Sequence, residues 1–119
     1  MVYSLQLLIP FAAVNRRNTA ITELQNQITT RPRWGAESIE AITSKAGDPA
    51  VFADLRFTSE GDNDSLEVWL RNQLTGVNTP RDGASIQIHR CRHDESAILA
   101  TCVPLRRFEV ISGVWQRII

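Results

Sequence analysis

The sequence predicts an α+β fold of the ferredoxin-like type: the order β-α-β-β-α-β, an antiparallel sheet with two helices on one face, and one or two extra C-terminal strands. Two segments carry this prediction. Residues 51–76 alternate apolar and polar side chains and then repeat apolar ones at helical spacing, and residues 3–28 do the same. A chain of 119 residues is long enough for one core, so we expect a single α+β domain over residues 1–119.

The first strand is predicted from period-two alternation. Its apolar positions are Tyr3, Leu5, Leu7 and Ile9. Pro10 ends this strand or places it at a sheet edge. The helix that follows is predicted from apolar side chains at helical spacing, which are Ile21, Leu24 and Ile28. Its expected N-cap is Asn18 or Thr19. The helix stops before Arg31-Pro32, because the residue before a proline avoids helical angles.

Residues Ala36 to Ala46 fit two structures. The spacing of Ile39 and Ile42 suits a short helix, whereas the alternation through residues 39–43 suits a strand. We predict a strand, because the turn cluster at residues 46–49 leads directly into the next strand and closes a hairpin. A helix here would change the order to β-α-β-α-β-β-β.

The strand and helix between residues 51 and 76 have the clearest pattern. The apolar face of the strand consists of Val51, Ala53, Leu55 and Phe57. Phe52, Asp54 and Arg56 point the other way. Asp64 with Glu67 three residues later indicates a capping box at the start of the helix. The side chains that this helix buries are Leu66, Trp69, Leu70 and Leu74. Gly76 then supplies the left-handed residue that commonly closes a helix.

Three more strands are expected in the C-terminal third. Ile86 and Ile88 begin one strand, and the segment from His93 to Ser96 makes a turn. The chain returns over Ala97 to Val103, and a last strand runs from Arg107 to Ile111.

Composition argues against several classes of protein. With 13 basic and 13 acidic residues the net charge is zero, so a general electrostatic attraction to nucleic acid or to an anionic membrane is not expected. No apolar run approaches the roughly 20 residues of a membrane span. Two cysteines do not make a disulfide framework, so we expect a cytoplasmic protein.

His89, Cys91, His93 and Cys102 are the residues that suggest chemistry. His89 and His93 would lie about 13 Å apart on a strand, too far to share a zinc ion, so no metal site and no cofactor is predicted. A two-residue turn at Asp94-Glu95 would leave the cysteines four residues out of register, beyond the roughly 7 Å between Cα atoms that a disulfide allows.

That register would make His89 and Cys102 diagonal neighbours, which permits a thiol–imidazole pair. The alternative is that the cysteines are small apolar residues and that His89 is half-exposed. For a reactive or ligand site the candidates are therefore His89 and Cys102, with Arg90 or Arg56 as the substrate anchor.

The strand at residues 52–57 partly resembles the third-strand motif of RNA-recognition domains, and residues 2–7 weakly resemble their first-strand motif. Those motifs place aromatic rings on an open sheet face. Here Asp54 occupies an expected aromatic position, and Tyr3 falls on the same side as the core residues of its strand. An RNA-binding domain is therefore the weakest of the functions considered, and nucleic acid is not an expected partner.

The C-terminal segment is unusually apolar. Val114, Trp115, Ile118 and Ile119 need a cover, which is either the chain's own core or another subunit. The function predicted from the sequence is a small non-enzymatic binding or protein-interaction module that forms a homodimer, with Phe108, Trp115 and Ile118 as interface anchors. The alternative is a dimeric ligand-binding enzyme or sensor that uses the sheet face around His89 and Cys102.

Overall fold

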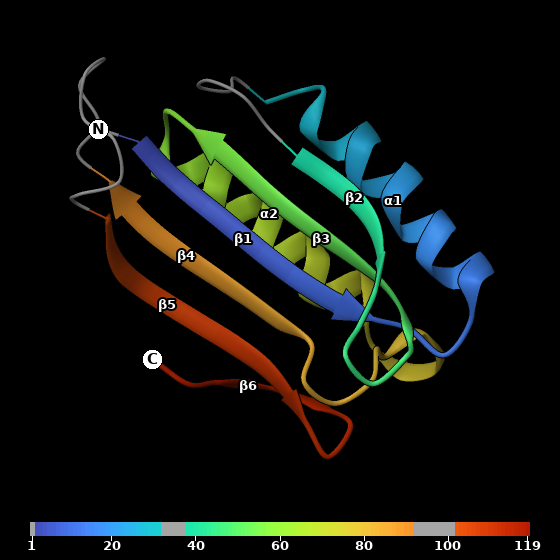
Figure 1. Cartoon of the computed structure of the whole chain (residues 1–119). Coiled ribbons are helices and arrows are strands. Elements are labelled where there is room, and N and C mark those ends of the chain that lie inside the picture. Colours follow the sequence, from blue (N-terminus) through green and yellow to red (C-terminus); the bar gives the residue numbers. More distant parts are fainter. Residues whose placement is uncertain (1, 32–37, 92–101) are drawn as a thin grey trace.

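The computed structural model describes residues 2–31, 38–91 and 102–119 (Figure 1). Within them the chain is α+β, with six strands in one antiparallel sheet and two α-helices. In chain order the elements are β1 (Val2–Pro10), α1 (Val14–Ile28), β2 (Ser38–Thr43), β3 (Pro49–Phe57), α2 (Glu60–Gln73), the 3₁₀ turn η1 (Gly76–Asn78), β4 (Ser85–Cys91), β5 (Cys102–Ile111) and β6 (Val114–Arg117). The predicted α+β class is confirmed.

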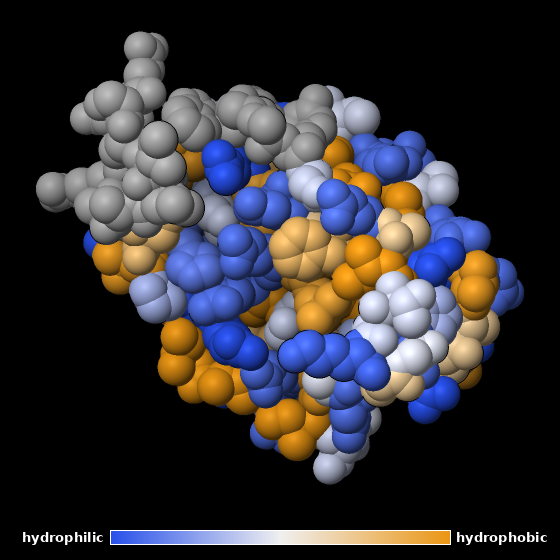
Figure 2. Space-filling view, in the orientation of Figure 1, coloured by the Kyte–Doolittle hydropathy of each residue, from blue (hydrophilic) through white to orange (hydrophobic). Residues whose placement is uncertain are grey.

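The strands lie in the order β2-β3-β1-β4-β5-β6, so β3 lies between β1 and β2, and β1 lies between β3 and β4. Helix α1 packs on β2 and β3, and α2 packs on β1 and β3. Both helices contribute to one core against one face of the sheet. The opposite face, which we call the open face, is turned toward the viewer in Figures 1 and 2 and carries no helix of the described residues.

Strand register explains why one face of the sheet is apolar. Leu5 of β1 is paired with Leu55 of β3 on one side and with Ile88 of β4 on the other. All three side chains are fully buried, and two positions further along Leu7 and Ile86 repeat the arrangement. Leu24 and Leu66 cover these rows from α1 and α2. The alternation seen in the sequence is thus the alternation between core and open face.

The ambiguous segment is a strand, as predicted. Strand β2 pairs with β3, and Ser44 closes the hairpin by donating its backbone N–H to the carbonyl of Asp48 at 2.8 Å. Gly47 has a φ of 87°, which the turn requires and which side chains disfavour.

Both helices begin earlier than predicted. The N-cap of α2 is Ser59, whose hydroxyl accepts a hydrogen bond from the N–H of Asp62, so the capping box at Asp64 is wrong. Helix α1 begins at Val14, and its N-cap Ala13 has no side chain that can accept a hydrogen bond. Asp64 instead lies one turn inside α2, where its carboxylate is available to the sheet.

Strand β5 corrects the predicted end of the fold. The sequence suggested one strand that ended at Val103 and another that began at Arg107, but the strand is continuous from Cys102 to Ile111. The register shifts between Ile88 and His89 of β4, so that Leu105 has no opposite residue, the arrangement of a β-bulge. Arg106 then reaches α2, where it pairs with Asp64 and lies 4.0 Å from Glu60.

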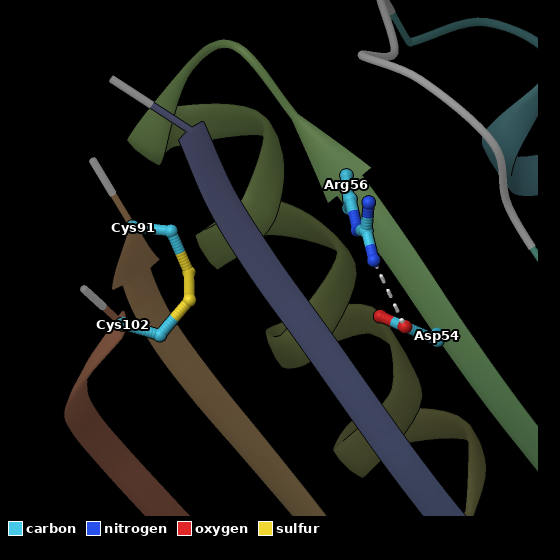
Figure 3. The surroundings of a disulfide bond; sticks show 4 residues. All are labelled: Asp54, Arg56, Cys91 and Cys102. Atoms are coloured by element: carbon cyan, nitrogen blue, oxygen red, sulfur yellow. Dashed lines mark ion pairs between the residues drawn. A yellow bond between two sulfur atoms is a disulfide. The ribbon is translucent and has the colours of Figure 1, made fainter. Parts of the chain in front are cut away.

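The two cysteines form a disulfide, which corrects the expectation that they are out of register. Cys91 is directly opposite Cys102 in the β4–β5 ladder, with 4.0 Å between their Cα atoms (Figure 3). The predicted turn at residues 93–96 and most of the predicted return strand lie outside the described residues. The error came from placing the centre of the hairpin at Asp94-Glu95, because the observed pairing of Cys91 with Cys102 is centred two residues further along the chain.

Candidate functional site

Two polar rows cross the open face at its centre. In the first, Arg56 of β3, Ser4 of β1 and His89 of β4 are consecutive cross-strand partners. In the second, Asp54, Gln6 and Gln87 are partners in the same way. Figure 2 shows hydrophilic side chains gathered over these middle strands. We call the six residues the polar face cluster.

Asp54 is the residue of this cluster with an unmet bonding requirement. One carboxylate oxygen lies 3.6 Å from a guanidinium nitrogen of Arg56, two residues along the same strand (Figure 3). The other oxygen, Oδ1, is buried and has no hydrogen-bond partner among the described residues. Most buried polar atoms in folded proteins have a partner, so this carboxylate oxygen is an exception that needs an explanation.

His89 is half-buried in the same cluster, in the neighbouring row and two strands away from Asp54. Burial lowers the pKa of its imidazole below the ordinary value of 6.5, and the negative charge of Asp54 raises that pKa by a smaller amount. The imidazole is therefore neutral at pH 7 and offers one donor and one acceptor nitrogen.

The thiol–imidazole pair predicted from the sequence is not present. Cys102 is bonded to Cys91, and the residue opposite His89 is Pro104. A disulfide sulfur has no proton to lose to a base, so Cys102 has no role as a thiolate nucleophile in this state.

Of the two arginines suggested as an anchor, the structure brings Arg56 and not Arg90 to the side of His89. Arg90 is the next residue of β4 and is paired with Tyr3, so it belongs to the opposite side of the sheet. Arg56 is separated from His89 by Ser4 alone. The alternation of β3 already placed Asp54 and Arg56 on one side, but alternation alone does not show which residues of β4 lie next to them.

The three candidate interface residues have different surroundings. Phe108 is 7% exposed and lies in the chain's own core, with the guanidinium of Arg71 4.3 Å from the centre of its ring. Trp115 packs against the core and donates its Nε1 proton to the carbonyl of Leu74 at 3.0 Å. Ile118 is 44% exposed. Of the three, Ile118 is the one whose side chain is largely available to a partner.

An apolar edge runs along β6. Among the described residues, strand β6 is the last strand of the sheet and pairs with β5 alone. The backbone continues to pair with β5 after β6, since the N–H of Ile118 donates to the carbonyl of Arg107 at 2.7 Å. The exposed apolar side chains here are Ile111, Val114, Ile118 and Ile119. Figure 2 shows hydrophobic side chains around β6 and the C-terminus, at the lower left.

Over residues 2–31, 38–91 and 102–119, no three His, Cys, Asp or Glu side chains are arranged to hold a metal ion. Nor is any helix in these ranges long and apolar enough to cross a membrane.

No protein-family model matches the chain, and no curated protein matches it. Among solved structures the chain is similar to LarC2, described as the C-terminal domain of a cyclometallase involved in the synthesis of the NPN cofactor of lactate racemase, in its apo form. The alignment covers 98% of this chain and 76% of that chain, with a TM-score of 0.39 and 12% sequence identity. A likeness of this degree supports no argument about function.

Proposed function

We propose that this chain is a small non-enzymatic protein-interaction module that forms a homodimer through the apolar edge at β6. The observation that carries the proposal is the coincidence, on one edge, of unpaired strand backbone and four exposed apolar side chains. Edge strands are usually protected by charges, prolines or a covering element, because they pair readily with other strands.

A second copy of the chain can form hydrogen bonds with the backbone of this edge strand. Antiparallel pairing of β6 with its own copy about a two-fold axis joins two sheets and places the same residues on both sides of the interface. It removes Val114 and Ile118 of both copies from water. The zero net charge of the chain means that the two copies do not repel each other at long range.

The classification of the sheet as ferredoxin-like belongs to the same proposal. It is supported by the order β1-α1-β2-β3-α2-β4 and by the position of β3 between β1 and β2, the form of a split β-α-β unit. Strands β5 and β6 are then the two extra C-terminal strands, and they supply the edge that dimerises.

The polar face cluster supports a second candidate, a ligand-binding enzyme or sensor. The buried Oδ1 of Asp54 favours it, because a ligand N–H or O–H would supply the missing hydrogen bond. His89 and Arg56 would provide further polar contacts on the same face, whereas Cys102 and Arg90 would not. Among described residues, no Lys, Cys or Ser bonded to His89 supplies a nucleophile, so binding is the simpler function.

The expected cytoplasmic location remains a prediction, and the disulfide argues against it. Disulfides persist in oxidising compartments and are rare in the cytosol. A homodimeric interaction module does not depend on which compartment holds it.

The test is the subunit number of purified protein by native mass spectrometry and light scattering. We expect a dimer for the wild type and a folded monomer for V114E and for I118E, because each change places two carboxylates at the two-fold interface. The matched control is V77E, since Val77 is 82% exposed on η1 and lies outside β6. The control should remain dimeric. A monomeric wild type, or a dimer that survives both β6 substitutions, would contradict the proposal.

A further inference from the structure

A pocket lies between the two helices, on the side of the sheet opposite to the open face. Helices α1 and α2 both pack on the sheet, and both contribute side chains to one core. The space between the first half of α1 and the end of α2 has a volume of about 200 Å³. It is lined by Phe11, Asn15, Arg16, Thr19, Ala20, Glu23, Gln73, Leu74 and Asn78. This volume suits a molecule of amino-acid to dipeptide size.

The rim of the pocket carries one positive and one negative side chain. Arg16 and Glu23 are seven residues apart on α1, which is two helical turns, so both lie on one face about 10 Å apart along the axis. Arg16 also donates a hydrogen bond to the carbonyl of Val77, which holds its guanidinium against η1. Within the described part of the chain Glu23 has no ion-pair partner. A ligand with a single charge would leave one of the two side chains without an oppositely charged partner.

The floor of the pocket continues into an apolar recess of about 20 Å³. Glu23 and Gln73 stand at the junction, because they line both spaces. Below them the recess is bounded by Leu24, Trp69 and Leu70, all of which belong to the core or pack against it. An apolar group can therefore reach buried surface from a point close to the Glu23 carboxylate.

The walls are held by hydrogen bonds of the chain itself. The N–H of Phe11 donates to the carbonyl of Pro49 at 2.7 Å, and the hydroxyl of Thr79 donates to the carbonyl of Gly76 at 2.8 Å. Trp115 holds the carbonyl of Leu74 at the end of α2. A pocket whose walls are fixed before binding loses less conformational entropy when a ligand enters.

We propose that this interhelical pocket binds a small zwitterion with an apolar side chain, of the amino-acid or short-peptide class. The ligand's ammonium group pairs with Glu23, its carboxylate approaches Arg16, and its apolar side chain lies over the mouth of the recess beside Leu24, which has room for about one methyl group. The amides of Gln73 and Asn78 lie on the opposite wall, where they can bond a peptide group of the ligand. This site shares no residue with the β6 edge, so its success or failure is independent of the dimer.

The experiment is an NMR titration of ¹⁵N-labelled protein with leucine, with a leucine-containing dipeptide, and with N-acetyl-leucine amide, which keeps the apolar side chain and has neither charge. We expect saturable shifts at the backbone amides of the pocket residues for at least one of the zwitterions. The neutral analogue should bind at least tenfold more weakly, the factor that one lost charged contact of about 1.4 kcal/mol produces.

The variant E23Q tests the charge directly, because it keeps the size and the exposed position of Glu23. We expect it to weaken binding at least tenfold, while the control E40Q, on β2, leaves the affinity unchanged. The proposal is overturned if neither zwitterion gives saturable shifts at the pocket, if the neutral analogue binds equally well, or if E23Q binds as the wild type does.

Discussion

Asn63 is buried on α2 with 0% of its surface exposed, and neither the oxygen nor the nitrogen of its amide has a hydrogen-bond partner in the part of the chain that the structure describes. It lies one turn before Glu67, which is 3% exposed but pairs with Arg71 at 3.1 Å. The cost of burying the Glu67 carboxylate is offset by its ion pair with Arg71, whereas no hydrogen bond within the described residues offsets the cost of burying the Asn63 amide.

Replacement of Asn63 by leucine should stabilise the protein. An unmet buried polar group costs about 1–3 kcal/mol, and N63L removes that cost while keeping a branched side chain. We expect the free energy of unfolding in denaturant to rise by about that amount. N72L on the exposed side of the same helix controls for helix propensity and should change it by less than about 0.5 kcal/mol. Equal effects at the two positions would show that the orphaned amide is not costly.

His89 makes stability depend on pH. Because folding holds its pKa below 6.5, the unfolded chain takes up this proton at a higher pH than the folded chain does. The contribution of His89 to the free energy of unfolding is therefore fully present above about pH 6.5. It is lost as the pH falls through the pKa that His89 has in the folded protein. An NMR titration of the imidazole should give a pKa below 6.5, and H89Q should lose this part of the pH dependence of unfolding.

The variant D54N tests whether the charge of Asp54 affects the pKa of His89. Asp54 raises the pKa of His89, so its neutralisation should lower that pKa further. D62N removes a carboxylate from the first turn of α2 instead and should leave the pKa of His89 unchanged. A pKa of His89 that rises in D54N would contradict the assigned cause.

At the scale of elements, alternation in the sequence was sufficient to locate most strands. It placed Leu55 in the core and Asp54 on the open face, because a strand exposes alternate residues. Helix starts were less well predicted, since α1 begins after an alanine with no capping side chain and Ser59 lacks a glutamate at the third position. Strand β5 was divided in the prediction because Pro104 and a bulge interrupt its pattern.

The disulfide joins the ends of β4 and β5 and should contribute measurably to stability. For a loop of 11 residues the chain-entropy estimate is about 2–3 kcal/mol. We expect dithiothreitol to lower the free energy of unfolding by this amount in the wild type. It should have no effect on the double variant C91S/C102S, which should match the reduced protein. Two free thiols in denatured, unreduced protein would show that the bond does not form.

At the scale of the whole molecule, the arrangement of strands decides which residues meet. The polar face cluster takes residues from β1, β3 and β4, and its members become neighbours only through the pairings on both sides of β1. Periodicity in a sequence gives the face of each residue but not its cross-strand partner, so Arg56 and His89 could be named separately and not as a group.

The interhelical pocket was even harder to predict from the periodicity of the sequence. Arg16 and Glu23 belong to one helix and their spacing is visible in the sequence, but the facing residues Gln73 and Asn78 come from α2 and η1. None of them has an unusual residue type. What makes them a pocket is that the fold brings α1, the end of α2 and η1 to the same place.

The bond between Cys91 and Cys102 also gives the chain a closed covalent ring that contains residues 92–101. A protease that cuts one peptide bond inside this ring adds a water molecule, but the two fragments do not separate, because the disulfide still joins β4 to β5. The nicked protein would migrate as a single species until it is reduced, and would then divide into an N-terminal piece with both helices and a C-terminal piece with β5 and β6.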